Sequence, residues 1–91
     1  MDQIFKVLSD KNRRKILEVL KERDMNVTEI SSHFTISGAS ISHHLDMLKR
    51  ARLIVSERDG QFIRYSLNTS VFEETIRMLL NVFGKGEDEK N

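Results

Sequence analysis

Apolar residues recur at the three- and four-residue spacing of a helix through the first half of the chain. Short helices are predicted at residues 2–9 and 11–23, separated by Ser9 and Asp10, whose side chains are suited to capping a helix. A third short helix is predicted after Asn26, because Glu29 follows three residues later in the spacing of a capping box. The chain is therefore predicted to open as a series of short, packed helices.

The segment 37–50 is predicted to be a helix with two different faces. Ile41, Leu45 and Leu48 recur at i, i+4 and i+7 and mark the direction of the core. Ser37 is the expected N-cap, and small or hydrogen-bonding groups occupy the side opposite the core. Two short helices joined by a few residues have the spacing of a helix-turn-helix. A slim polar face of this kind suits a helix that enters a major groove about 12 Å wide.

The pattern changes from helix to strand after residue 52. The runs 53–58 and 61–67 are rich in β-branched and aromatic residues, and Asp59-Gly60 between them is a strong signal for a two-residue hairpin turn. We interpret this hairpin as a wing that carries Arg58, Gln61 and Arg64 near or along its tip. The alternative is a solvent-facing hairpin whose arginines only favour solubility. The helix-turn-helix directly before it favours the wing.

The last predicted helix, from residue 69 or 70 to residue 83, is apolar over more of its surface than one small core requires. A chain of 91 residues buries a modest fraction of its surface, so a second copy is a useful source of additional core. We therefore expect a homodimer formed by this helix and residues 2–9, with these interface residues: Ile4, Phe5, Leu8, Phe72, Ile76, Leu79, Leu80 and Phe83.

Composition narrows the possible functions more by exclusion than by pointing to a partner. The chain has no cysteine, which excludes disulfides, thiolate nucleophiles and thiolate metal sites. A net charge of +1 does not by itself indicate nucleic acid, although residues 37–64 have a small basic excess. No apolar run is long enough for a membrane span or a signal peptide, so we expect no membrane insertion and a cytoplasmic location, associated with the nucleoid when bound to DNA.

The start of the helix at 11–23 is unusually basic, with Lys11, Arg13, Arg14 and Lys15. Positive charge at a helix N-terminus opposes the helix dipole, which indicates a role other than helix stability. One interpretation is an anionic partner. The other is a solvated basic turn balanced by Asp10.

Several sequence motifs, in the correct order, resemble the ArsR/SmtB family of bacterial and archaeal winged-helix repressors. The segments 5–17, 26–30 and 40–48 are similar to the family's opening, its third helix and its recognition helix, and residues 52–54 and 60–65 match its wing. The resemblance covers about residues 2–83. It implies a mainly α fold with a β-hairpin wing, a dimer formed through the first and last helices, and binding to two-fold symmetric operator DNA.

Carried over by position, the resemblance places a set of side chains against double-stranded DNA. These are Ser37, Gly38, Ala39, Ser40, Ser42, His43 and His44 in the recognition helix, with Arg58, Gln61 and Arg64 in the wing. Because Gly38 and Ala39 are nearly bare, direct base reading is expected to depend on Ser40, His43 and methyl contacts, with DNA shape supplying the rest.

Two residues depart from the family pattern. The second helix begins with Lys11-Asn12 where the family usually has a proline in the first turn, which reduces pre-organisation. Arg52 replaces a common glycine after the recognition helix, and a left-handed backbone there would cost a non-glycine residue about 1 kcal/mol. A phosphate contact by Arg52 is one explanation for its presence.

The family's usual metal sites are not present in these residues. The third helix has Ser31 and His33 where related sensors have cysteines, and the last helix has no histidine. We therefore predict a repressor of its own or a neighbouring operon that uses no metal or other cofactor. The alternatives are a metal-responsive repressor with a non-standard histidine site and a winged helix used only for protein binding. A regulatory protein partner is compatible with the resemblance but is not identified by these residues.

An enzyme is the least favoured class. Ser42, His43 and His44 contain the groups of a nucleophile and a base, but catalysis also needs an orienting group and an oxyanion site in a pocket. The expected organisation is one winged helix-turn-helix DNA-binding and dimerisation domain at 1–83, followed by a flexible charged tail at 84–91.

Overall fold

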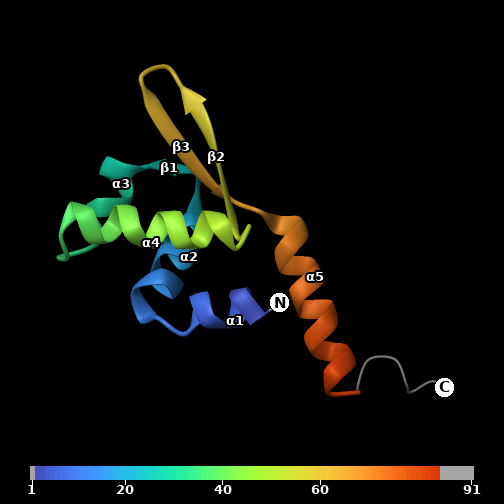
Figure 1. Cartoon of the computed structure of the whole chain (residues 1–91). Helices are drawn as coiled ribbons and strands as arrows, with labels where there is room; N and C mark the ends of the chain where they lie inside the picture. Colours follow the sequence, from blue (N-terminus) through green and yellow to red (C-terminus); the bar gives the residue numbers. More distant parts are fainter. Residues whose placement is uncertain (1, 85–91) are drawn as a thin grey trace.

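The computed structural model describes residues 2–84, which form five helices and three strands (Figure 1). In chain order these are α1 (Asp2–Leu8), α2 (Lys11–Glu22), β1 (Met25–Asn26), α3 (Val27–Ser31), α4 (Gly38–Arg50), β2 (Ile54–Asp59), β3 (Phe62–Leu67) and α5 (Thr69–Val82). The predicted class, mainly α with a β-hairpin wing, is confirmed. All but the first residue of the predicted tail lie outside the described residues, so the division at residue 83 stays a prediction.

Side-chain caps fix where three of the helices begin. Asp10 accepts hydrogen bonds from the backbone N–H groups of Asn12 and Arg13 at 2.8 and 3.2 Å, which starts α2. Asn26 and Glu29 form a reciprocal capping box at the start of α3, with both bonds at 2.9 Å. Ser37 caps α4. Each cap was predicted from the sequence, because a cap depends on residues only two or three positions apart.

The core lies where α1, α2, α3 and α4 meet the base of the hairpin. Its apolar side chains are nearly inaccessible to solvent, and Val7, Ile16, Ile30, Ile41, Leu48 and Leu53 are fully buried. The stripe predicted for the fourth helix, Ile41, Leu45 and Leu48, is buried as expected. The core therefore holds α4 by one side only.

A short strand that the sequence pattern did not predict completes the sheet. Met25–Asn26 pairs antiparallel with β3, placing Met25 opposite Tyr65, and the sheet order is β1-β3-β2. Met25 is buried, although the sequence pattern assigned it only to the end of the preceding helix. Two residues are too few to show the alternation of a strand, so β1 exists because β3 provides its hydrogen-bonding partner.

The hairpin turn lies one residue later than predicted. Asp59 pairs with Phe62 as the last pair of the β2–β3 ladder, so the two-residue turn is Gly60-Gln61 and not Asp59-Gly60. Gly60 has a φ of +65°, the left-handed value that a glycine at the first turn position supplies without steric cost.

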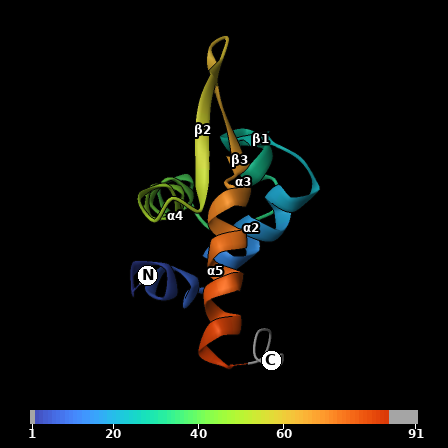
Figure 2. The same ribbon diagram turned by 90° about the vertical axis from the view of Figure 1, so that its right-hand side faces the viewer.

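The hairpin and α5 extend from the helical body in opposite directions (Figures 1 and 2). Thr75 is the only residue of α5 that is buried, and its hydroxyl donates to the carbonyl of Val71 at 2.8 Å. The apolar side chains of Ile76 and Phe83 are 56% and 72% exposed. Within residues 2–84, no helix is long and apolar enough to cross a membrane.

Candidate DNA-binding surface

The face of α4 opposite the core is slim, polar and accessible. Gly38, Ala39, Ser42 and His43 are exposed, and Ser40 is half-buried. A side chain built at Gly38 would meet no other atom within 4 Å, so packing inside the subunit does not require glycine at that position. A second molecule can approach the backbone closely there. This matches the predicted outward position of four of the site residues, and of Ser40 in part, whereas their contact with DNA stays a prediction.

The first turn of α4 presents two linked hydroxyl groups. The Ser37 hydroxyl oxygen accepts from the backbone N–H of Ser40 at 3.1 Å and lies 3.2 Å from the Ser40 hydroxyl oxygen. The pair is exposed at the start of the helix. The same oxygen that caps the helix thus also holds the Ser40 hydroxyl in place on the outward side.

The expectation that His44 faces DNA is wrong. His44 is 9% exposed and turns toward α2, where its Nδ1 lies 3.2 Å from Nη1 of Arg13. Burial lowers the pKa of His44, and electrostatic interactions with Arg13 and His43 lower it further, whereas the Asp10 carboxylate opposes this by raising it. The sequence placed His44 near the edge of the core stripe. The partner on α2 draws its side chain inward.

The basic start of α2 is explained by contacts within the subunit. Arg13 Nε donates to the carbonyl of Val7 at 2.8 Å, and Arg14 Nη1 donates to the carbonyl of Leu8 at 2.6 Å. Lys15 lies over the ring of Phe34, 4.8 Å from its centre. The two arginines therefore bind the free carbonyls at the end of α1, a role that neither sequence interpretation included.

The three predicted DNA-binding residues of the hairpin differ in exposure and in their contacts. Arg58 and Gln61 are exposed, and Arg58 Nη1 lies within 3.5 Å of the Gly60 carbonyl. Arg64 is instead held by Asp59, whose Oδ2 accepts from Arg64 Nε at 3.0 Å and from Nη2 at 2.6 Å. This hydrogen-bonded carboxylate raises the pKa of Arg64. Sequence reasoning missed the pair, because the two residues become diagonal neighbours on one side of the hairpin only in the observed register.

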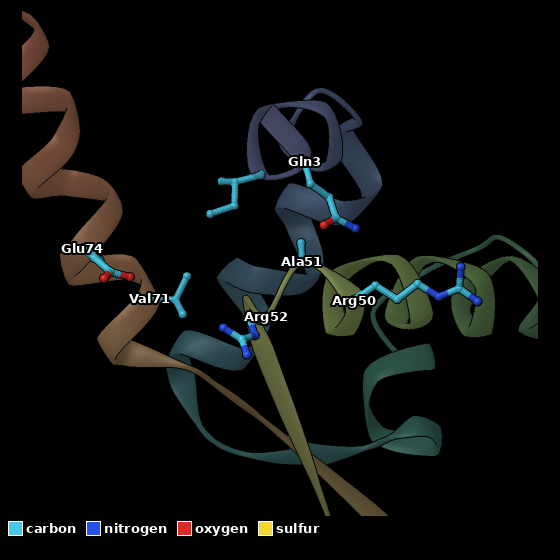
Figure 3. Close-up of a pocket in the computed structure, with 7 residues that line it drawn as sticks. Gln3, Arg50, Ala51, Arg52, Val71 and Glu74 are labelled. Atoms are coloured by element: carbon cyan, nitrogen blue, oxygen red, sulfur yellow. The ribbon is translucent and has the colours of Figure 1, made fainter. Parts of the chain in front are cut away.

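Arg52 has a left-handed backbone, with a φ of +66°. It directly follows the helix C-cap Ala51, where glycine is favoured. Figure 3 shows Arg50 pointing away along α4, whereas Arg52 extends towards Val71 at the start of α5. A pocket of about 230 Å³ lies here, lined by Gln3, Ile4, Arg50, Ala51, Arg52, Val71 and Glu74. The phosphate contact suggested for Arg52 stays a prediction.

The residues predicted for the dimer interface divide into three groups. Ile4 is 7% exposed and belongs to the core of the subunit, so its assignment to an outer surface is wrong. Leu8, Phe72 and Leu79 are half-buried. An exposed apolar group, which we call the dimer face, remains: Phe5, Ile76, Leu80 and Phe83, together with Val82. Ile4 and Phe5 are consecutive residues of α1, and only the packing of α1 shows which of the two is buried.

No group of three or more possible metal ligands comes together within residues 2–84. His43 and His44 are the nearest to such a group, with ring centres 5.8 Å apart, but His44 is turned toward Arg13. A zinc ion needs three or four convergent ligands. The described residues therefore show a surface suited to binding a large partner and no arrangement that suits a metal.

Known proteins resemble this chain in both sequence and structure. The family model for bacterial regulatory proteins of the arsR family matches residues 10–56. The transcriptional repressor SdpR of Bacillus subtilis (strain 168) is 51% identical over 89 residues, which cover 98% of this chain and 99% of that protein. The arsenical resistance operon repressor of Staphylococcus aureus is 30% identical over 79 residues, covering 87% and 76% of the two chains.

Solved structures share the same architecture. An ArsR-like transcriptional regulator from Rhodococcus sp. RHA1 superposes with a TM-score of 0.83 and 28% identity, covering 89% of this chain and 76% of that one. A possible transcriptional regulator for arsenical resistance gives a TM-score of 0.78 and 29% identity, covering 99% and 92%. The fold, the helix-turn-helix and the matched residues agree. The chain belongs to the arsR family of bacterial regulatory proteins and is a DNA-binding transcriptional repressor.

Proposed function

We propose that this protein represses its own or a neighbouring operon by binding a two-fold symmetric operator as a homodimer. The observation that carries the proposal is the outward face of α4, where Gly38, Ala39, Ser42 and His43 are exposed while the core stripe on the opposite side is buried. In this arrangement α4 lies in the major groove and the wing lies against the neighbouring minor groove or its phosphates. We place the protein in the cytoplasm, on nucleoid DNA when bound.

The side chains of α4 support recognition of the operator through few direct contacts to bases. The hydroxyls of Ser40 and Ser42 and the ring of His43 can hydrogen-bond to bases or phosphates, and Ala39 offers a methyl group to a thymine. Gly38 leaves the helix start bare, which permits close approach of the DNA backbone. Sequence-dependent DNA shape supplies the remaining specificity through Arg58, Gln61 and Arg64 on the wing.

The proposed dimer sets the distance between the two reading helices. The dimer face contains three exposed apolar residues on α5, one at its C-cap and one on α1, and covering them removes apolar surface from water. Two recognition helices related by two-fold symmetry read half-sites one helical turn apart, about 34–36 Å. We therefore expect a palindromic operator whose half-sites have this spacing.

We further propose that repression needs no metal effector. His33 is exposed, Ser31 has no metal-binding side chain, and His44 is already bonded to Arg13. Adding zinc is therefore expected to leave operator affinity unchanged. A large loss of affinity on zinc addition, reversed by a chelator, would contradict this part of the proposal.

Titration into the duplex upstream of its own gene tests the proposal. At about 150 mM salt, we expect binding to this duplex to be at least roughly a thousandfold tighter than binding to a scrambled duplex of the same length. A neighbouring promoter is the second duplex to test. Equal affinity for both promoters and for scrambled DNA would refute sequence-specific repression at these sites.

The exposed histidine of α4 gives a sharper test of the surface. His43→Ala is expected to reduce discrimination between operator and scrambled DNA by about 1–3 kcal/mol, because a base contact is lost. His33→Ala is the matched control, since His33 is also exposed but lies outside the proposed surface. An unchanged footprint for His43→Ala would mean that another face of the domain binds DNA.

A further inference from the structure

His44 is the buried histidine of the recognition helix. Among residues 2–84, the buried polar side chains are those of His44 and Thr75, and the Thr75 hydroxyl is satisfied within its own helix. His44 instead reaches outside its helix to Arg13 on α2. A buried polar group that bonds to another element restricts how the two elements can sit relative to each other.

One guanidinium joins α4 to the end of α1. Arg13 Nη1 lies 3.2 Å from His44 Nδ1, and Arg13 Nε donates to the carbonyl of Val7 at 2.8 Å. A guanidinium only donates hydrogen bonds, so Nδ1 of His44 must accept and the ring must be neutral, with its proton on Nε2. The contact therefore depends on the protonation state of His44.

The charged groups around the ring favour this neutral state. Burial lowers the pKa of His44, the carboxylate of Asp10 in the α1–α2 turn raises it, and electrostatic interactions with Arg13 on α2 and His43 on α4 lower it, with a lowered pKa as the result. A proton on Nδ1 would remove the acceptor and place two cations next to each other. Protonation is thus expected to break the bond between α4 and Arg13.

We propose that neutral His44 is a positioning residue that fixes the recognition helix to the α1–α2 junction, so that protonation of His44 loosens α4 and weakens operator binding. This inference rests on the proposed function. Because Arg13 also holds the end of α1, and α1 carries Phe5 of the dimer face, the same bond helps to set the angle between the two reading helices.

The expected pH dependence has a definite sign. In the unfolded chain His44 binds a proton near its ordinary pKa of 6.5, whereas in the fold its pKa is lower. The stability contributed by neutral His44 is therefore present above pH 6.5 and is lost as the pH falls through the folded-state pKa. Operator affinity is expected to fall once the pH drops below the folded-state pKa, because only then does the ring of the free, folded protein take up a proton. An exposed histidine near phosphates would have the opposite effect, because its positive charge attracts DNA.

Operator affinity across pH tests the inference, with wild type, His44→Asn and His33→Asn compared from about pH 8 to about pH 5.5. The Oδ1 atom of an asparagine can occupy the place of Nδ1 and accept from Arg13, but it does not titrate. Wild type and His33→Asn are expected to lose up to about a hundredfold in affinity of the dimer per pH unit below the folded-state pKa, the slope for uptake of one proton by each of the two subunits. His44→Asn is expected to keep its affinity. Circular dichroism at each pH restricts the comparison to folded protein.

Ring-nitrogen NMR of the wild-type protein provides a test that needs no variant. We expect His44 to be the neutral Nε2–H tautomer at about pH 7 and its pKa to fall further when operator DNA binds, because the bound state requires the neutral ring. A charged ring at that pH, or a pKa that stays equal or rises on binding, would overturn the inference. Parallel loss of affinity in wild type and His44→Asn would also overturn it while leaving the repressor intact. Failure of the wild type to prefer its operator at about pH 8 would instead refute the proposed function.

Discussion

At the scale of single residues, Arg52 adopts an unfavourable backbone conformation directly after α4. Its φ of +66° places an arginine in the left-handed region at the position where α4 turns into the wing. The side chain is exposed, so its own packing does not compensate for the backbone. The backbone N–H of Leu53 bonds to the carbonyl of Leu48 at 3.0 Å, which fixes the reversal of the chain. The reversal of the chain therefore imposes the left-handed backbone at residue 52, and arginine adopts it in spite of the conformational cost.

Replacing Arg52 by glycine is expected to stabilise the fold by about 1 kcal/mol, because glycine adopts this φ without a steric penalty. Urea unfolding followed by circular dichroism measures the change. Lys49→Gly, at an exposed position inside α4, is the matched control and should destabilise by roughly 0.5–1 kcal/mol. If both variants lost stability equally, the left-handed backbone at residue 52 would carry no cost. Weaker operator binding by Arg52→Gly would in addition support a phosphate contact.

At the scale of elements, acidic residues of the wing partly neutralise the positive charge of the wing. Asp59 and Arg64 face the same side of the hairpin and share two hydrogen bonds, while Glu57 lies directly across from Arg64 in the register. Both members of the pair are partly exposed, so the pair contributes little to stability. Its main effect concerns DNA. While Arg64 is bound to Asp59, its guanidinium is less available to a phosphate.

The substitution Asp59→Asn is expected to strengthen operator binding and to steepen its salt dependence, since released Arg64 can neutralise one more phosphate. The slope of log affinity against log salt should change by about 0.9 for each subunit, which is about 1.8 for the dimer. Fluorescence anisotropy at several salt concentrations measures both quantities. Glu57→Gln removes the same charge from the wing without breaking the pair, so it controls for charge alone. Identical salt slopes for the two variants would show that Arg64 is not released.

At the scale of the whole molecule, α5 is the element that the subunit leaves incomplete. It extends away from the helical body, and its contact with the core is limited to the residues near its start (Figure 2). The exposed side chains of the dimer face cluster on its later turns and on nearby α1. A helix with this much exposed apolar surface favours association with a second copy.

Leu80→Lys is expected to produce a folded monomer, because Leu80 is 48% exposed and a charge there interrupts only the dimer face. Sedimentation equilibrium measures the mass, and operator affinity should fall by roughly tenfold or more because the two half-sites are no longer bound together. Val55→Lys is the matched control for the mass measurement, since Val55 is similarly exposed at 44% but lies outside the dimer face. A Leu80→Lys variant that remained dimeric would place the interface elsewhere.

The sequence by itself determined the order of the five helices and the hairpin, the helix caps at Asp10, Asn26 and Ser37, and the buried stripe of α4. These features arise from residues a few positions apart, since a cap bonds to the next turn and a stripe follows the helical period. For the caps and the stripe, local chemistry was sufficient. The left-handed backbone at Arg52 was raised only through the resemblance to the family, in which glycine is common at that position.

Only the tertiary structure decided which of two adjacent residues is buried and which is exposed. His43 and His44 are adjacent, yet the first is exposed and the second is buried against Arg13, which lies 31 residues away in the sequence. Ile4 enters the core while Phe5 does not, and β1 forms only where β3 pairs with it. Helical periodicity gives the direction of a side chain only approximately, and at the edge of a stripe the partner on another element determines whether it turns inward. That partner is brought close by the fold, and no local pattern encodes it.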